Sequence, residues 1–71
     1  ESLTVSDLNW FVEPVFPLKC KARIRYRQEL QSCTVEQDLS VKFDEPQRAV
    51  TPGQSIVFYD GDIVLGGGII D

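Results

Sequence analysis

The run LKCKARIRYR at residues 18–27 alternates strictly between an apolar and a basic side chain. A period of two residues is typical of a β-strand that packs one face on a core and turns the other to solvent. The apolar face would hold Leu18, Cys20, Ala22, Ile24 and Tyr26, and the basic face Lys19, Lys21, Arg23, Arg25 and Arg27. The sequence therefore predicts a strand over residues 18–27 with a row of cations on its outer face.

Turn residues divide the rest of the chain into further short strands, and no window shows a helical period. We expect strands over residues 4–12, 32–37, 39–43, 55–59 and 62–65 in addition to 18–27. Pro52-Gly53 fits the central positions of a type II turn, and Asp60-Gly61 is a hairpin signal. The run Gly66-Gly67-Gly68 precedes neither a Lys nor a helix, so we interpret it as a sharp bend rather than a phosphate loop.

Six antiparallel strands within 71 residues predict an all-β fold, a small six-stranded antiparallel β-barrel. Closure of the barrel would remove the exposed sheet edges that invite aggregation. A small two-layer sandwich is the alternative. Outside residues 18–27, the side chains expected to face the core are Leu8, Trp10, Val12, Cys33, Val35, Leu39, Val41 and Phe43.

The composition narrows the kinds of site that this chain can hold. The net charge of −4 and the pI near 4.6 argue against a free-standing nucleic-acid binder. The chain has no His, the commonest general base and metal ligand, and we expect neither a catalytic residue nor a metal site. The spacing of its turn acids fits no calcium loop; these acids are Asp38, Asp44, Glu45, Asp60 and Asp62.

Cys20 and Cys33 are too few for a disulfide scaffold or a zinc site. We interpret them as half-buried thiols, with a single disulfide between them as the alternative. Their inward position disfavours a nucleophilic role, because burial raises the pKa of a thiol.

The basic row of residues 19–27 has two interpretations. Same-face neighbours in a strand are about 6.5–7 Å apart, so four neighbouring pairs repel by roughly 2 kcal/mol in total at low salt. Glu36 and Asp38 on the next strand are one source of compensating charge. A phosphate backbone is the other, and Arg favours phosphate because its planar fork binds it in a bidentate manner. Tyr26, between two arginines, is either a core-edge side chain or a platform for an unpaired base.

Several short runs together resemble the C-terminal domain of tRNA-specific 2-thiouridylases. The entry strand carries VSD at 5–7 and NW at 9–10, and RIRYRQ at 23–28 is followed by Cys33. The later runs are FDEP at 43–46, AVTPGQS at 49–55, VFYDG at 57–61 and LGGGII at 65–70. They occur in the family's order and cover most of the chain. The chain lacks Met and opens with Glu1, so we expect residues 1–71 to be one C-terminal domain of a longer multidomain enzyme.

The resemblance implies a β-barrel similar to those of translation factors and aminomethyltransferases. It implies a cytoplasmic parent enzyme that uses ATP and Mg to activate the C2 carbonyl of the wobble uridine of tRNA and takes sulfur from a cysteine persulfide. The ATP loop and catalytic cysteines would lie in other domains, so this chain alone would be inactive and hold no cofactor. The family's tRNA-contacting Arg-Tyr pair corresponds to Arg25 and Tyr26. The basic row adds Arg23, Arg27, Lys21 and Lys19 as weaker candidates.

Two rival roles remain open for the domain. It could be a structural barrel that packs on the catalytic domain of the same chain and contacts no RNA. It could also dock a sulfur-carrier protein through an exposed apolar patch, for which Phe11, Val15 and Phe16 are the candidates.

Overall fold

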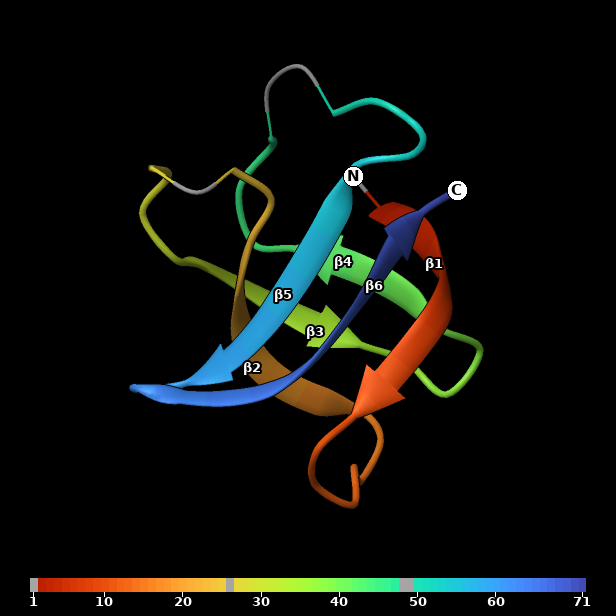
Figure 1. Cartoon of the computed structure of the whole chain (residues 1–71), viewed down its shortest axis with the longest axis vertical. Helices are drawn as coiled ribbons and strands as arrows, with labels where there is room; N and C mark the ends of the chain where they lie inside the picture. The colour runs from red at the N-terminus through yellow and green to blue at the C-terminus, as the bar shows by residue number, and fades with distance from the viewer. Residues whose placement is uncertain (1, 26, 48–49) are drawn as a thin grey trace.

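Six antiparallel strands close into a barrel in the computed structural model, which describes residues 2–25, 27–47 and 50–71 (Figure 1). The strands are β1 (Ser2–Trp10), β2 (Leu18–Arg23), β3 (Gln31–Val35), β4 (Ser40–Phe43), β5 (Ser55–Asp60) and β6 (Ile63–Ile70). Their order around the barrel is β1-β4-β3-β2-β5-β6, and every neighbouring pair is antiparallel. The predicted all-β barrel is therefore confirmed, and the sandwich alternative is wrong.

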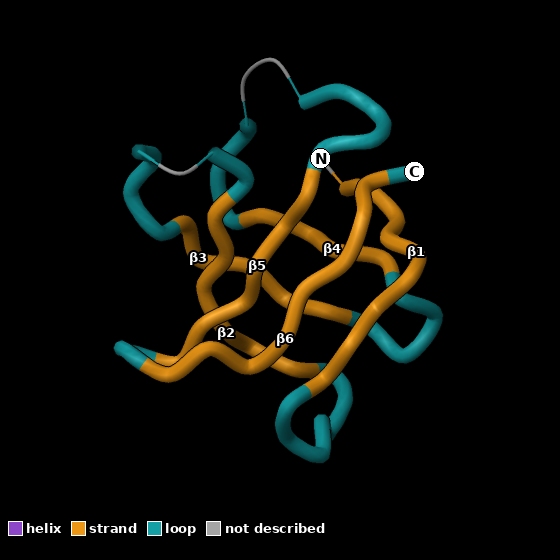
Figure 2. Tube along the Cα trace, viewed as in Figure 1, coloured by secondary structure: helices purple, strands orange, loops and turns teal. Residues whose placement is uncertain are grey.

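The barrel closes because β1 pairs with the strands on both of its sides. β2, β3 and β4 form a meander, β5 and β6 form a hairpin, and β1 lies between β4 and β6. The β2–β3 and β4–β5 connections extend from the same end of the barrel (Figure 2). No helix among the described residues has the length and apolar character needed to cross a bilayer.

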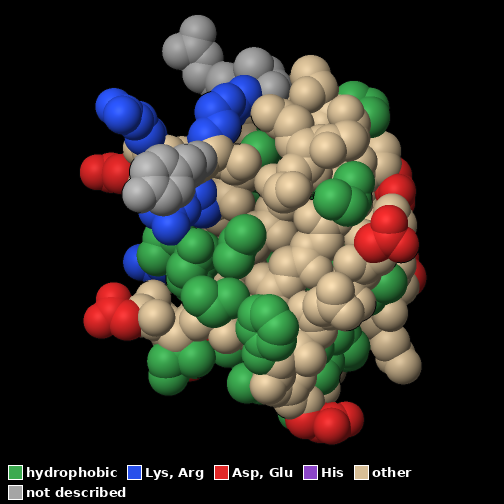
Figure 3. Space-filling model, in the orientation of Figure 1, with side chains coloured by type: hydrophobic (Ala, Val, Ile, Leu, Met, Phe, Trp, Pro, Cys, Tyr) green, Lys and Arg blue, Asp and Glu red, His purple; other side chains and the backbone are tan. Residues whose placement is uncertain are grey.

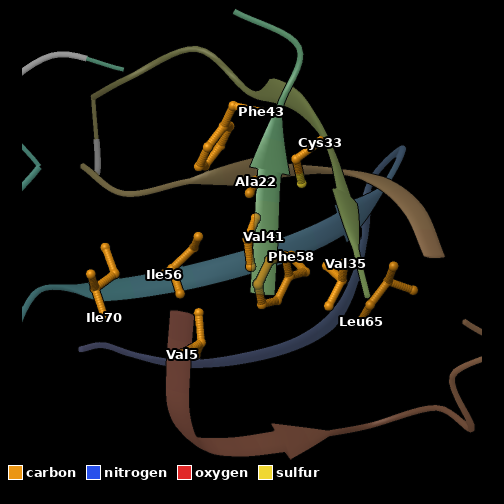
Figure 4. Packing of buried hydrophobic residues seen from close by; sticks show 10 residues of the cluster. All are labelled: Val5, Ala22, Cys33, Val35, Val41, Phe43, Ile56, Phe58, Leu65 and Ile70. Carbon is orange, nitrogen blue, oxygen red and sulfur yellow. The ribbon is translucent and has the colours of Figure 1, made fainter. Parts of the chain in front are cut away.

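The core draws on every strand (Figure 4). Its buried members are Val5, Ala22, Cys33, Val35, Val41, Phe43, Ile56, Phe58, Leu65 and Ile70. Phe58 is fully buried, and the Trp10 ring stacks on it with centroids 5.6 Å apart. Phe16 meets the same Trp10 ring edge-on at 6.2 Å, so the three aromatic rings contact one another from the β1–β2 connection to the core.

β2 ends at Arg23, four residues earlier than predicted. The backbone N–H groups of Ile24 and Arg25 donate to Oε1 of Gln28, at 2.9 and 3.3 Å, instead of joining a strand ladder. A turn closes when the N–H of Gln28 donates to the carbonyl of Arg25 at 3.0 Å. The alternating pattern therefore continues into a loop that carries Arg25 and Arg27, while Tyr26 lies outside the described residues.

The predicted end of the last strand at Leu65 is wrong, because β6 continues through Gly66-Gly67-Gly68 as far as Ile70. The glycines are required by close packing instead. A Cβ on Gly66 would lie 2.3 Å from the backbone oxygen of Asn9, and one on Gly68 would lie 2.5 Å from Cγ1 of Val5. Without these side chains, β6 lies tight against β1 on one side and β5 on the other.

Three smaller predictions needed correction at strand ends. β1 ends at Trp10, so Val12 is 42% exposed rather than core-facing. Leu39 lies in the β3–β4 turn at φ 67°, and β4 begins after it. The β5–β6 turn falls on Gly61-Asp62, because Asp60 still pairs with Ile63. The turn at Pro52-Gly53 is confirmed by the Gln54-to-Thr51 hydrogen bond and a φ of 91° at Gly53.

Candidate nucleic-acid interface

The outer face of β2 carries the first part of the basic row. Lys19 and Lys21 are exposed and Arg23 is half-buried, while Ala22 between them is fully buried. The predicted division of this strand into an apolar and a basic face is therefore confirmed as far as Arg23. Arg25 and Arg27 are exposed and continue the row in the loop that follows. Figure 3 shows Lys and Arg side chains gathered at the upper left of the molecule.

Arg23 is held against the neighbouring strand β5. One terminal nitrogen of its guanidinium donates to the hydroxyl of Tyr59 at 2.9 Å. The guanidinium carbon also lies 5.2 Å from the centroid of the Tyr59 ring, within the range of a cation–π contact. These two contacts fix the orientation of the guanidinium on the face of β5.

The loop after β2 is held by a chain of glutamine side chains. Gln28 accepts the two backbone N–H groups of Ile24 and Arg25, and its Nε2 donates to Oε1 of Gln47 at 2.8 Å. Nε2 of Gln47 donates in turn to the carbonyl of Glu45 at 2.9 Å and to Oε1 of Gln31 at 3.5 Å. The β2–β3 and β4–β5 connections are thereby joined by neutral amides.

Sequence reasoning missed Gln28, Gln47 and Tyr59 as parts of this surface. Gln28 closes the RYRQ run, and its presence there was the available signal. Gln47 and Tyr59 are distant along the chain, and only strand pairing and loop packing bring them to the basic row.

Neither Glu36 nor Asp38, the acids proposed as internal partners, lies directly across the β2–β3 ladder from Lys19 or Lys21. In the β2–β3 ladder, Lys19 faces Thr34 and Lys21 faces Ser32. Asp38 lies in the β3–β4 turn, where Oδ1 accepts the hydroxyl of Ser40 at 2.7 Å and its N–H at 3.0 Å. These hydrogen bonds, the hydroxyl foremost, lower the pKa of Asp38 below its usual value.

A hollow of about 670 Å³ opens beside the basic strand. Lys19 and Lys21 line it together with three acids, Asp44, Asp60 and Asp62. Because both cations and carboxylates line the hollow, its charge does not favour the binding of an anion. Among residues 2–25, 27–47 and 50–71 no cluster of three metal-ligating side chains occurs.

Cys20 and Cys33 also line this hollow, and both are free thiols. Their sulfur atoms are 3.8 Å apart. The contact between the two sulfur atoms lowers the pKa of Cys20, whereas the same contact, together with burial, raises the pKa of Cys33. The expected free thiols are confirmed, but Cys33 is buried rather than half-buried. The expectation that burial raises the pKa holds for Cys33 and is wrong for Cys20.

The apolar patch considered for docking is only partly present. Phe11 is 72% and Val15 is 76% exposed, but Phe16 packs against Trp10 and the core. Ile63, at the far turn of the β5–β6 hairpin, is also 61% exposed.

The fold and this surface define a small all-β barrel module with a basic strand and loop on its outer side. The chain belongs to the aminomethyltransferase beta-barrel domain family, with a match over residues 1–70.

The chain is also similar to proteins described as "tRNA-specific 2-thiouridylase MnmA". It is 51% identical over 76 residues to the protein of Francisella philomiragia, covering 99% of this chain and 21% of that protein. It is 54% identical over 76 residues to that of Pseudomonas fluorescens Pf0-1, covering 99% and 20%. For Protochlamydia amoebophila the identity is 52% over 75 residues, covering 99% and 20%. The chain thus spans about a fifth of the length of the curated relatives that it matches.

Proposed function

We propose that this chain is the tRNA-holding barrel of a tRNA-specific 2-thiouridylase. The observation that carries the proposal is the continuous basic row, which passes from the exposed face of β2 into an anchored loop with Arg25 and Arg27. The identity of 51–54% to relatives with that name supports the same assignment. Lys19, Lys21, Arg23, Arg25, Tyr26 and Arg27 are the residues assigned to tRNA.

The role of these residues is to bind phosphates rather than to read bases. Contacts from Lys and Arg to phosphate fix the position of a nucleic acid but carry little sequence information. Arg23 and Arg25 present planar guanidinium groups, which bind two phosphate oxygens at once. The barrel would therefore fix where the tRNA lies, and the rest of the enzyme would select the nucleotide.

The chemistry belongs to the remaining four-fifths of such an enzyme. There, ATP with Mg would activate the C2 carbonyl of the wobble uridine, and a cysteine persulfide would supply the sulfur. The barrel's partners in this scheme are the tRNA, the catalytic domain of the same protein and, through that domain, a sulfur-carrier protein. The cytoplasm is the compartment proposed for this reaction.

The net charge of −4 is compatible with this role, because phosphate binding depends on where the cations lie. Five of the seven Lys and Arg residues fall within residues 19–27. A patch of this size makes only a few phosphate contacts, so the barrel alone would bind weakly at physiological salt. The proposal is accordingly tested in the complete enzyme.

The test is tRNA binding by the full-length enzyme across a salt series, comparing the wild type with Arg25→Ala. Loss of one phosphate contact is expected to weaken binding and to reduce the slope of log K against log salt by about one unit. Lys42→Ala is the matched control, because Lys42 is an exposed cation on β4, two strands away from β2. Equal slopes for the wild type and Arg25→Ala would overturn the assignment of Arg25.

A second role rests on the exposed apolar side chains of the β1–β2 connection. Phe11 and Val15 are both more than 70% exposed, and such side chains favour a protein contact. Under this alternative the barrel packs on the catalytic domain or docks a sulfur carrier without touching RNA. Substituting both residues by Ser would then weaken that protein contact, while the salt slope for tRNA would stay unchanged in Arg25→Ala.

A further inference from the structure

The two cysteines lie directly opposite each other on neighbouring strands. Cys20 of β2 pairs with Cys33 of β3 in the antiparallel ladder, and their sulfur atoms are 3.8 Å apart. Directly opposed residues in an antiparallel pair have Cα atoms about 4.5–5.5 Å apart. That separation falls within the roughly 4.4–6.8 Å that a disulfide spans. The backbone therefore does not need to move far for the two sulfurs to bond.

The two thiols differ in their access to solvent. Cys33 is 3% exposed, whereas Cys20 is half-buried, and both border the hollow beside β2. A small reagent that enters the hollow therefore meets Cys20 first. The two members of the pair are thus arranged as an accessible thiol backed by a buried one.

The surroundings also make Cys20 the more acidic thiol. The hydrogen bond between the two thiols lowers the pKa of Cys20 against the opposing effects of burial and of the Asp60 carboxylate. Contact with Cys20, burial and the Asp44 carboxylate raise the pKa of Cys33. Because the thiolate is the reactive form of cysteine, attack is directed to Cys20.

We propose that Cys20 and Cys33 form an oxidation site at which hydrogen peroxide closes a disulfide between β2 and β3. The Cys20 thiolate attacks one peroxide oxygen and the O–O bond breaks, which leaves a sulfenic acid on Cys20 and releases water after protonation. The sulfur of Cys33 then attacks the sulfenic sulfur. The S–O bond breaks, and the departing hydroxide takes the Cys33 proton and leaves as a second water. Two thiols are oxidised and one peroxide is reduced.

The location of this bond gives it a consequence for the basic loop. The Cys20–Cys33 pair lies two residues before Ala22↔Gln31, the last pair of the β2–β3 ladder, and the loop with Arg25 and Arg27 begins beyond it. A covalent bond here ties the base of that loop across the two strands. The oxidised protein is expected to resist thermal unfolding better than the reduced protein, because the cross-link restricts the unfolded chain.

The test treats the purified, reduced protein with hydrogen peroxide, blocks the remaining thiols with N-ethylmaleimide and maps chymotryptic peptides by mass spectrometry without reductant. The expected product joins peptides 19–26 and 31–39 with the loss of two hydrogen atoms, and dithiothreitol separates them. The melting temperature should rise on oxidation and return on reduction.

Two variants assign the order of events. In Cys33→Ser the sulfenic acid on Cys20 has no partner, so dimedone should trap it at Cys20. In Cys20→Ser the buried Cys33 should stay reduced under the same treatment. Circular dichroism confirms that each variant is folded, and the wild-type peptide map alone decides the main point if either is not. The proposal is overturned if both cysteines of the treated wild type remain alkylatable, or if they oxidise separately without a cross-link.

Discussion

The guanidinium of Arg23 lies over the ring of Tyr59 and donates to the Tyr59 hydroxyl at 2.9 Å, so that β5 holds a cation of β2 in a fixed orientation. An Arg side chain on an open strand surface would otherwise lose rotamer freedom when it bound a phosphate. The contact with Tyr59 removes part of that freedom before any ligand arrives. Under the proposed function, we therefore expect Tyr59 to act as a positioning residue for Arg23.

Tyr59→Phe should weaken tRNA binding by the full-length enzyme by about two- to tenfold, the equivalent of one hydrogen bond of roughly 0.5–1.5 kcal/mol. The ring and its cation–π contact remain, so Arg23 keeps its charge but loses the hydrogen bond that helps to orient its guanidinium. Filter binding at fixed salt measures the change. The salt slope should remain that of the wild type, because no phosphate contact is deleted; a smaller slope would contradict a purely positioning role.

Gln28→Ala should lower the free energy of unfolding by about 1 kcal/mol, because it removes the acceptor of the part-buried Ile24 N–H, whereas water can replace the acceptor of the exposed Arg25 N–H. Chemical denaturation provides the measurement. Gln28→Glu keeps an acceptor oxygen but loses the donor to Gln47, so its cost should be smaller. Gln37→Ala, at an exposed glutamine of the β3–β4 turn, is the control and should change stability by less than about 0.5 kcal/mol. Equal effects at Gln28 and Gln37 would show that the loop does not depend on the amide.

Gly66→Ala should destabilise the barrel by about 3 kcal/mol or more, because the new methyl group would collide with the backbone oxygen of Asn9, which cannot move aside as a side chain would. Gly61→Ala is the matched control. It has open space around the added carbon but a φ of 59°, so only the backbone strain of about 1 kcal/mol applies. Thermal unfolding of both variants compares the cost of the steric collision at Gly66 with the cost of the backbone strain at Gly61. A cost at Gly66 no larger than that at Gly61 would be inconsistent with the close contact of β6 and β1.

Asp38 should titrate below about 3.9, the ordinary value for an aspartate, in the folded protein. Its folded pKa is depressed, so the stability that it contributes is present above the unfolded pKa and is lost as the pH falls through the folded pKa. Ser40→Ala removes the hydroxyl donor but keeps the N–H donor, so the midpoint should move upward without reaching the ordinary value. NMR titration of the carboxyl carbon follows both proteins; an unchanged midpoint in Ser40→Ala would refute the role of the hydroxyl.

The apolar–basic alternation of residues 18–27 predicts the structure of β2 correctly only as far as Arg23. The alternation in residues 18–23 predicted the two faces of β2, because side-chain direction in a strand follows from the backbone alone. The same alternation continues to residue 27, yet the strand ends at Arg23, because Gln28 competes for the amides of Ile24 and Arg25. Nothing in the local period distinguishes an amide bonded to a neighbouring strand from one bonded to a side chain.

The glycine run shows a second limit of the same kind. Three successive glycines usually indicate a flexible corner, and that was the prediction here. Their actual cause is the backbone of Asn9 on β1 and of Ile56 on β5, against which β6 packs. These contacts join residues far apart in the chain, so they become visible only when the barrel is closed. The residues named from the sequence as tRNA contacts stay a prediction, and the contacts that Tyr59 and Gln47 make with their surroundings were not predicted.

The glutamine chain that joins the two connections has a consequence for how the basic loop responds to its medium. Gln28 and Gln47 carry no charge at any pH, and their hydrogen bonds are short-range contacts rather than ion pairs. Added salt screens the attraction between cations and phosphates but leaves such amide contacts almost unaffected. The loop should therefore keep one shape from dilute to concentrated buffer. Under the proposed function, ionic strength would then change the affinity of the basic row for tRNA phosphates without changing the conformation of the loop that carries Arg25 and Arg27.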